Sequence, residues 1–267
     1  MKKIVLANQK GGVGKSAIAV QLAYYLRSID KRVLLVDFDH QRNTTKAIKT
    51  GGLATISHVV SSKILSTAVT EINNSDFVLV PGDNDELLKM EKQGDKHSHF
   101  ANNLLSFLKA VDNKFDVCIF DTNPNPDIRQ LASLVVSDYV LSPIQLNQEA
   151  IDGIGDLLNH GTIGIRRIQA TINPKLKLLG ILPNLVEPTP FQRNNLATLS
   201  QHYSNLFISL GENGFALIKK TTAIPEAQAL GVPLFEYKKV KTSAYEAWKQ
   251  IEPVFEKLAE LMELSHA

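Results

Sequence analysis

The segment from Gln9 to Ser16 reads Gln-Lys-Gly-Gly-Val-Gly-Lys-Ser, and it holds the residue types that bind a nucleotide phosphate. Glycines let backbone N–H groups turn towards phosphate oxygens, a lysine reaches the β- and γ-phosphates, and a Ser or Thr hydroxyl holds magnesium. An apolar run precedes the segment and an amphipathic helix follows it. The spacing predicts a P-loop whose nucleotide contacts are Gly11, Gly12, Val13, Gly14, Lys15, Ser16 and Ala17.

Lys10 stands at the front edge of this loop, although Lys15 already supplies the lysine that the bound phosphate needs. We expect Lys10 to serve a neighbouring phosphate, and a solvated surface lysine is the alternative. The spelling Lys-Gly-Gly-Val-Gly-Lys-Ser resembles the deviant Walker A motif of the ParA/MinD family of P-loop ATPases. The resemblance implies ATP and Mg²⁺ as cofactors, an ATP-dependent homodimer, and catalytic roles for Lys10 and Lys15, with Lys10 reaching across the dimer interface.

Two carboxylates, Asp37 and Asp39, follow the second apolar run. The segment resembles the family's switch I, usually spelled Asp-x-Asp-Pro-Gln-Gly-Asn. The resemblance implies that Asp39 orients the water that attacks the γ-phosphate and that Asp37 supports the magnesium shell; a helix cap is the alternative for Asp39. His40 stands where proline is common and Arg42 where glycine is common, so we expect a reshaped switch.

The run Cys-Ile-Phe-Asp that ends at Asp121 has the Walker B pattern. We expect Asp121 to hold magnesium through water, together with Ser16. The family continues Thr-Pro-Pro, whereas this chain reads Thr-Asn-Pro-Asn-Pro-Asp over residues 122–127. The predicted switch II loop is therefore altered.

Asn184 follows another predicted strand, at a place where the family often reads the adenine with a polar side chain. An asparagine amide can both donate and accept, although a plain turn asparagine is the alternative. The stretch 224–233 resembles the family's Ile-Pro…Glu-Ala…Gly-x-Pro segment. The resemblance thus covers nearly the whole chain.

Short apolar runs alternate with helix-length segments along the chain, which predicts an α/β fold. Runs that are apolar on both faces are typical of a doubly wound, mostly parallel sheet flanked by helices, as in the P-loop NTPase fold. Ligands in such folds bind at the carboxyl ends of the strands. The expected strands are residues 3–8, 32–37, 76–81, 115–121, 139–143, 177–183 and 216–220.

The composition favours one domain, residues 1–267, because the chain has 44% apolar residues and no linker, repeat or low-complexity block. The N-terminus runs straight into the first strand, which favours a cytoplasmic protein without a signal peptide. The one cysteine, Cys118, lies in a strand and is expected to be buried. The last helix carries three glutamates and one lysine over residues 253–264, so we expect it to pack onto the sheet and not onto a membrane.

Net charge is only +2, yet residues 160–245 hold ten Lys or Arg against four Glu. This excess favours a surface that faces a polyanion, and solvated faces are the alternative. The resemblance to partition ATPases implies non-specific binding of double-stranded DNA, a ParB-like adaptor that stimulates otherwise slow hydrolysis, and association with the nucleoid. No helix-turn-helix precedes the P-loop, so we expect sequence-independent binding. The candidate contacts are Arg166, Arg167, Lys175, Lys177, Arg193, Lys219, Lys220, Lys238, Lys239 and Lys241.

Two other functions stay open from the sequence. One is a small-molecule P-loop ligase or kinase of the dethiobiotin-synthetase type, which shares the fold but usually lacks the front lysine. The other is a nucleotide-gated interaction module whose altered switches hydrolyse ATP slowly.

Overall fold

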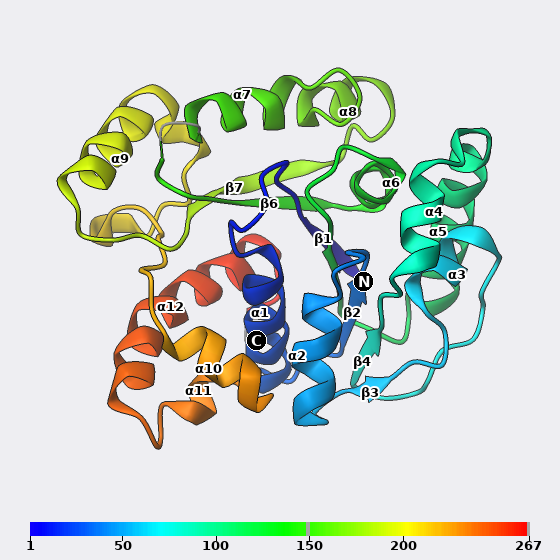
Figure 1. Ribbon diagram of the computed structural model, residues 1–267, viewed down its shortest axis with the longest axis horizontal. Helices are drawn as coiled ribbons and strands as arrows, with labels where there is room; N and C mark the ends of the chain where they lie inside the picture. The colour runs from blue at the N-terminus through cyan, green and yellow to red at the C-terminus, as the bar shows by residue number, and fades with distance from the viewer. Residues whose placement is uncertain (148–149, 266–267) are drawn as a thin grey trace.

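The computed structural model describes residues 1–147 and 150–265. Within these residues, seven strands form one sheet in the order β3-β4-β2-β5-β1-β6-β7 (Figure 1). All neighbouring strands run parallel. The predicted fold class is confirmed. The strands are β1 (Lys2–Leu6), β2 (Val33–Asp37), β3 (Thr55–Ile56), β4 (Phe77–Val80), β5 (Val117–Asp121), β6 (Tyr139–Ile144) and β7 (Lys177–Pro183).

The strand predictions differ from the structure at two places. The short edge strand β3 was not expected, because two residues give no readable alternation. The expected strand 216–220 is wrong: the segment is not a strand of the sheet, and its Lys219 forms an isolated bridge with Val186. Ala216 and Ile218 are buried all the same, because they pack into the core that also holds the C-terminal helix. The Ile218 N–H donates to the carbonyl of Pro183 at the end of β7, at 2.8 Å.

Helices cover both faces of the sheet (Figure 1). One layer contains α1 (Lys15–Ser28), α2 (Asn43–Gly51), α10 (Ala223–Leu230), α11 (Leu234–Tyr237) and α12 (Thr242–Leu261). The other contains α3 (Ser61–Ser66), α4 (Asp85–Glu91), α5 (His97–Val111), α6 (Ile128–Val136), α7 (Ala150–Asn159), α8 (Ile165–Thr171) and α9 (Pro190–Tyr203). Short 3-10 turns lie at η1 (Gly94–Lys96), η2 (Ser204–Leu206) and η3 (Gly211–Asn213).

The alternation of side chains along each strand builds two hydrophobic cores. In β5, Val117 and Ile119 face the layer that contains α1, whereas Cys118 and Phe120 face the layer that contains α5. Cys118 is fully buried, as expected. Because both faces are covered, the sheet can contact a ligand only at the ends of its strands.

The C-terminal helix α12 packs against α1 through aromatic side chains. The ring of Tyr25 lies 6.3 Å from that of Trp248 and 5.8 Å from that of Phe255. The apolar face of α12 is therefore buried inside the protein, and the contacts above are with α1, not with the sheet on which the sequence placed it. None of the helices in the described part of the chain is both long and apolar enough to cross a membrane.

Candidate active site

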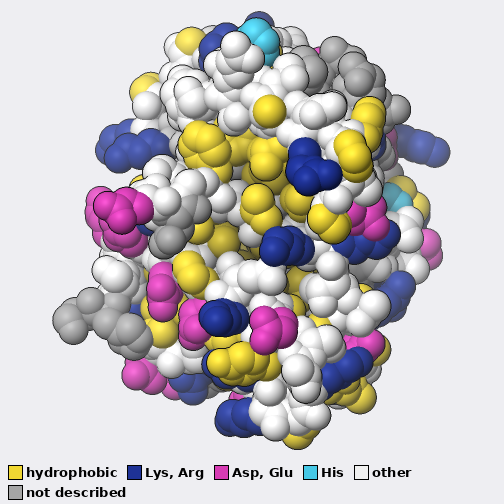
Figure 2. Space-filling view, turned by 90° about the vertical axis from the view of Figure 1, so that its left-hand side faces the viewer, with side chains coloured by type: hydrophobic (Ala, Val, Ile, Leu, Met, Phe, Trp, Pro, Cys, Tyr) yellow, Lys and Arg dark blue, Asp and Glu magenta, His cyan; other side chains and the backbone are white. Residues whose placement is uncertain are grey.

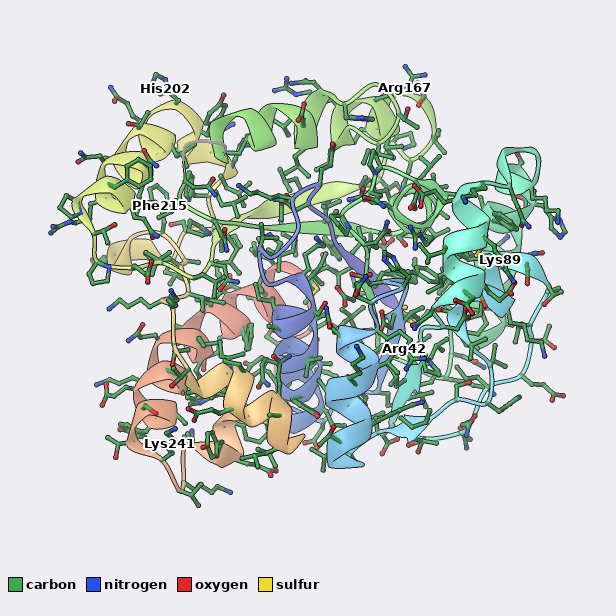
Figure 3. The ribbon with its side chains drawn as sticks, in the orientation of Figure 1. Arg42, Lys89, Arg167, His202, Phe215 and Lys241 are labelled. Carbon is green, nitrogen blue, oxygen red and sulfur yellow. The ribbon has the colours of Figure 1, made fainter. Side chains whose placement is uncertain are left out.

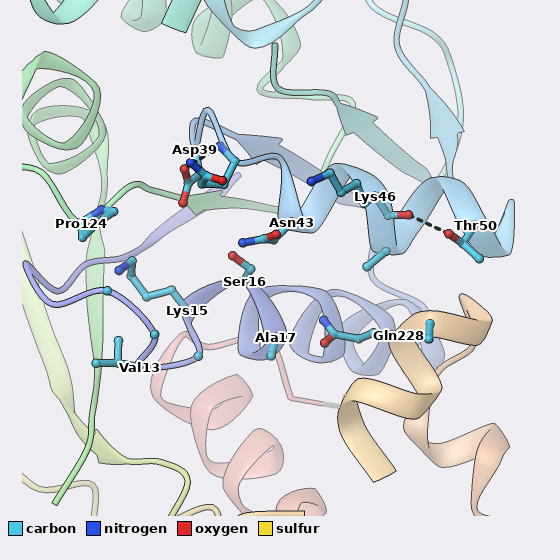
Figure 4. Close-up of a pocket in the computed structure, with 16 residues that line it drawn as sticks. Val13, Lys15, Ser16, Ala17, Asp39, Asn43, Lys46, Thr50, Pro124 and Gln228 are labelled. Atoms are coloured by element: carbon cyan, nitrogen blue, oxygen red, sulfur yellow. Dashed lines mark hydrogen bonds between the residues drawn. The ribbon is translucent and has the colours of Figure 1, made fainter. Parts of the chain in front are cut away.

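Three loops meet where β1, β2 and β5 lie side by side in the sheet. They are the P-loop after β1, the switch I segment after β2 and the switch II segment after β5. They border a cavity of about 550 Å³, which we call the P-loop cavity (Figure 4). Its lining comprises residues 11–17 together with Asp39, Gln41, Asn43, Lys46, Ala47, Thr50, Pro124, Gln228 and Ala229.

Glycines give the P-loop its curvature. Gly12 and Gly14 have φ angles of 76° and 89°, in the left-handed region that favours glycine, and Gly14 is also the N-cap of α1. Lys15 begins that helix, and its Nζ donates to the backbone carbonyls of Asn8 at 3.1 Å and Lys10 at 3.3 Å. Burial lowers the pKa of Lys15, and the charges of Asp121 and Asp39 only partly oppose that fall. The loop thus holds a buried amine beside a helix N-terminus, an arrangement suited to phosphate.

Asp37 holds the switch I segment in place. It is fully buried, and its Oδ2 accepts hydrogen bonds from the backbone N–H and the hydroxyl of Thr45, at 2.9 and 2.6 Å. Its Oδ1 accepts from the N–H of Asp39 at 3.0 Å. Burial raises the pKa of Asp37, and the neighbouring charge of Asp121 raises it further. Both oxygens of this expected magnesium-supporting residue are therefore engaged by switch I donors.

Asp121 has the features of a magnesium ligand. Its Oδ2 accepts from the Thr44 hydroxyl at 2.8 Å, whereas its Oδ1 is buried without a hydrogen-bond partner among the described residues. Burial raises the pKa of Asp121 to about 6, and the hydroxyls of Ser16 and Thr44 oppose that rise. No group of three or more His, Cys, Asp or Glu able to hold a metal lies in the described ranges. The unpartnered Oδ1 of Asp121 and the Ser16 hydroxyl suit a magnesium ion that would take its other ligands from phosphates and water, as is common for Mg²⁺.

Asp39 faces the P-loop cavity together with Lys15 (Figure 4). Its Oδ1 accepts from the backbone N–H of Gln41 at 2.9 Å. The N-cap of α2 is Arg42, not Asp39, and Gln41, whose N–H donates to Asp39, precedes that helix. Arg42 has a φ of 57°, which explains why glycine suits this position. The carboxylate of Asp39 is thus directed to the cavity, not to helix capping.

Asn184 is buried, and its side-chain N–H donates to the Val13 carbonyl at 2.8 Å. The side-chain amide therefore supports the P-loop. Beside it lies a second cavity of about 460 Å³, the apolar cavity, whose lining includes Ala17, Ile18, Leu185, Ile218, Ile224 and Pro225.

Sequence reasoning missed two buried polar residues near the site. Gln21 lines the apolar cavity; its Oε1 accepts from the N–H of Leu234 at 2.8 Å, and its Nε2 is buried without a partner among the described residues. A glutamine inside the buried stripe of α1 was the available signal. The other is Arg129 of α6, which is fully buried close to switch I.

The ten basic residues proposed for DNA do not form one patch. Arg167 on α8 and Lys241 at the start of α12 lie on opposite sides of the molecule (Figure 3). Lys220 pairs with Glu187 at 2.8 Å, Lys241 pairs with Glu226, and Lys238 lies 5.3 Å from the centre of the Trp248 ring. The remaining members are Arg166, Lys175, Lys177, Arg193, Lys219 and Lys239, spread over α8, β7, α9 and the segments around α10 and α11.

One face combines apolar and basic side chains. Figure 2 shows hydrophobic side chains gathered in a hollow on the side formed by α9 and α10–α12, with Lys and Arg around them. The apolar cavity draws its lining from α1, α10, α12 and the 218–222 segment. This side is therefore where the apolar cavity and the basic residues Lys219 and Lys220 occur together.

Comparisons with known proteins agree with this geometry. The family described as AAA domain matches residues 1–178, two thirds of the chain. Protein IncC of Escherichia coli is 32% identical over 280 residues, which cover 99% of this chain and 71% of IncC. The chromosome-partitioning ATPase Soj of Thermus thermophilus is 28% identical over 263 residues, which cover 97% of this chain and 98% of Soj.

Solved structures share the fold. Apo McdA of Cyanothece has a TM-score of 0.75 at 22% identity, covering 97% of this chain and 99% of McdA. Cobyrinic acid a,c-diamide synthase of Mycobacterium smegmatis, with a bound ATP analogue and magnesium, has a TM-score of 0.64 at 26% identity. The match covers 90% of this chain and 96% of the synthase. From the family match and the identity with IncC over almost the whole chain, this protein belongs to the AAA domain family and, within it, to the ParA/MinD family of P-loop partition ATPases.

Proposed function

We propose that this chain, acting as one domain over residues 1–267, is a partition ATPase that ATP converts into a homodimer able to bind DNA. The observation that carries the proposal is a P-loop with two lysines, in which Lys15 is buried beside Asp39 and Asp121 while Lys10 stands at the front of the same loop. One lysine suffices for the loop's own phosphate. Lys10 is therefore proposed to contact the nucleotide of the second subunit.

The residues of the cavity are proposed to have different roles in ATP hydrolysis. The N–H groups of the P-loop and the Lys15 amine bind and orient the phosphates, and Asp39 positions the attacking water through the carboxylate that faces the cavity. Ser16 and Asp121 would hold magnesium, which neutralises charge on the phosphates. Asp37 keeps Asp39 in place through its hydrogen bond to the Asp39 N–H.

The apolar cavity is proposed to hold the adenine. It shares Gly14, Ala17 and Gln228 with the P-loop cavity, so a base can lie there while its phosphates occupy the P-loop. Apolar walls with few polar groups are typical of such pockets. The buried Nε2 of Gln21 is an available donor, and Asn184 contributes by fixing the loop at Val13.

Binding to DNA is proposed to follow dimerisation and to end with hydrolysis stimulated by a ParB-like adaptor, in the cytoplasm at the nucleoid. Two modest basic surfaces joined in one dimer bind a polyanion far more tightly than either alone. This property makes the interaction switchable by ATP.

The test is binding to random-sequence duplex DNA with ATP, with ADP and without nucleotide. We expect binding with ATP only, lost in Lys10→Ala together with the dimer and prolonged in Asp39→Ala because ATP persists. Equal binding with ADP and ATP, or none with either, would contradict the cycle.

A small-molecule synthetase is the second candidate, because the Mycobacterium smegmatis diamide synthase matches over 90% of this chain. Such an enzyme hydrolyses ATP in step with an acceptor substrate. Turnover that rises with a carboxylic acid acceptor, and not with DNA, would favour it.

A further inference from the structure

The side-chain amide of Asn8 joins the end of β6 to the front of the P-loop. Just beyond the end of β1, the Ala7 N–H donates to the Leu141 carbonyl of β6 at 3.1 Å. The Nδ2 group of Asn8 donates to the Pro143 carbonyl at 2.8 Å and lies 3.4 Å from the Ser142 hydroxyl. Asn8 is buried, with 5% of its surface exposed. Its side chain therefore continues the pairing of β1 with β6 by one more bond.

The same amide holds the backbone of Lys10. Its Oδ1 accepts from the Lys10 N–H, two residues further along the chain, at 2.7 Å. An asparagine that accepts from this N–H forms an Asx-turn. The Lys10 carbonyl accepts from Nζ of Lys15 at 3.3 Å. Because the backbone determines the direction of a Cα–Cβ bond, these two contacts set the direction in which the Lys10 side chain leaves the loop.

A bound nucleotide would compete for only one of the two contacts. Phosphate attracts the Lys15 amine, because a charged oxygen is a stronger acceptor than a backbone carbonyl. The Asn8 amide is neutral and bonded to β6, so its bond to the Lys10 N–H does not depend on Lys15. The contact from Asn8 would therefore persist in the ATP-bound state, in which Lys10 is proposed to reach the second subunit.

We propose that Asn8 is a positioning residue for dimerisation: it fixes the Lys10 backbone to the end of β6 and so directs the Lys10 side chain to the nucleotide of the second subunit. The proposal rests on the proposed role of Lys10. Asn8 is not part of the lining of the P-loop cavity. It contacts Lys15 through its backbone carbonyl, at 3.1 Å, which a substitution retains. Nucleotide binding by one subunit therefore depends less on the Asn8 side chain than dimerisation does.

The experiment measures two affinities in Asn8→Ala and Asn8→Ser. One is the Kd for a fluorescent ADP analogue, and the other is the dimer Kd with a non-hydrolysable ATP analogue, from sedimentation velocity. We expect Asn8→Ala to raise the dimer Kd at least about tenfold and the ADP Kd less than about twofold, because a misdirected lysine weakens a charged contact across the interface. The Ser hydroxyl can still accept from the Lys10 N–H, so Asn8→Ser should raise the dimer Kd only about threefold.

Asn173→Ala is the matched control. Nδ2 of Asn173 donates to the Ser137 carbonyl at 2.7 Å and lies 3.3 Å from the Leu134 carbonyl, near the amino ends of β6 and β7. The substitution removes a similar tie far from Lys10, so both affinities should stay within about twofold of wild type. A loss of the dimer in Asn173→Ala equal to that in Asn8→Ala would overturn the inference.

Three further results decide the inference. An unchanged dimer Kd in Asn8→Ala would overturn it, and so would an equal rise in the ADP Kd and the dimer Kd, because Asn8 would then shape the whole P-loop. If Lys10→Ala dimerises like wild type, the proposed role of Lys10 fails and this inference with it. If Lys10→Ala loses the dimer while Asn8→Ala keeps it, only the inference fails. Should Asn8→Ala fail to fold, a wild-type dimer Kd in Asn8→Ser would overturn the inference.

Discussion

Asp121 combines full burial with one unpartnered carboxylate oxygen, and so it carries a cost in the nucleotide-free protein. Burial favours the neutral form of the Asp121 carboxyl group and raises the pKa of Asp121 to about 6. Phosphate-bound magnesium would reverse that preference. The residue most suited to the metal is therefore a source of instability without it.

We predict that Asp121→Asn stabilises the nucleotide-free protein at pH 7.5 while abolishing magnesium-dependent hydrolysis. The free energy of unfolding should rise by about 1–3 kcal/mol. A carboxyl group whose pKa is higher in the folded than in the unfolded protein makes the wild type less stable as pH rises from about 4 to about 6, and the amide of Asn does not ionise. Urea unfolding with EDTA at pH 4.5 and 7.5 measures it: the difference between variant and wild type should grow with pH. A variant that is less stable than wild type at pH 7.5 contradicts the prediction.

Gly82, which follows β4, packs against the end of β2. A Cβ there would lie 3.1 Å from the carbonyl oxygens of Asp37 and Asp39, and the Gly82 N–H donates to the Thr45 hydroxyl at 2.9 Å. We predict that Gly82→Ala shifts switch I by a few tenths of an ångström and lowers kcat about tenfold. Steady-state hydrolysis checks this, with Gly155→Ala as control because a Cβ at Gly155 meets open space. Equal rates in the two variants would count against it.

Among the elements, α2 and α10 form the outer wall of the P-loop cavity and touch through their C-terminal glycines. A Cβ on Gly231 would lie 2.0 Å from the Gly51 nitrogen. Lys46 of α2 and Gln228 of α10 both line the cavity. Close approach of these two backbones therefore sets the width of the cavity on this side.

We predict that Gly231→Ala destabilises the protein by about 3 kcal/mol or more, because overpacking adds to the cost of a left-handed residue. Gly52→Ala is the matched control. Gly52 also caps a helix with a positive φ of 62°, yet a Cβ there meets nothing, so its cost should be about 1 kcal/mol. Thermal unfolding of both variants measures the difference, and similar losses would show that the close approach matters little.

For the whole molecule, the two ends of the strands carry different basic residues. Lys219 and Lys220 lie beside the apolar cavity on the side of the P-loop, whereas Lys177 begins β7 and Lys175 precedes it at the amino ends of the strands. The proposed dimer closes over the P-loop side. Only lysines near that side can form one continuous surface from two subunits.

We predict that Lys219→Glu with Lys220→Glu weakens ATP-dependent DNA binding at least about tenfold and lowers the slope of log K against log salt by about 2, one for each lost phosphate contact. The same charge reversal at Lys175 and Lys177 is the control and should change affinity less than about threefold. A larger loss from the control pair would place the DNA surface at the other end of the sheet.

The sequence by itself determined the P-loop, the strand ends that carry Asp37, Asp39 and Asp121, and the parallel sheet. These features are local, because each motif consists of consecutive residues. Strands whose side chains are apolar on both faces require a sheet that is covered on both sides.

Tertiary structure decided the rest. The bond from Asn184 to Val13, the contact of His40 with Arg129 and the Gly51–Gly231 approach join residues far apart in the chain. The order of strands determines which loops become neighbours, and local apolar patterning does not encode that order. For the same reason residues 216–220 look like a strand yet are not one of the seven strands of the sheet. Arg167 and Lys241, two of the ten basic candidates, likewise lie on different sides of the molecule.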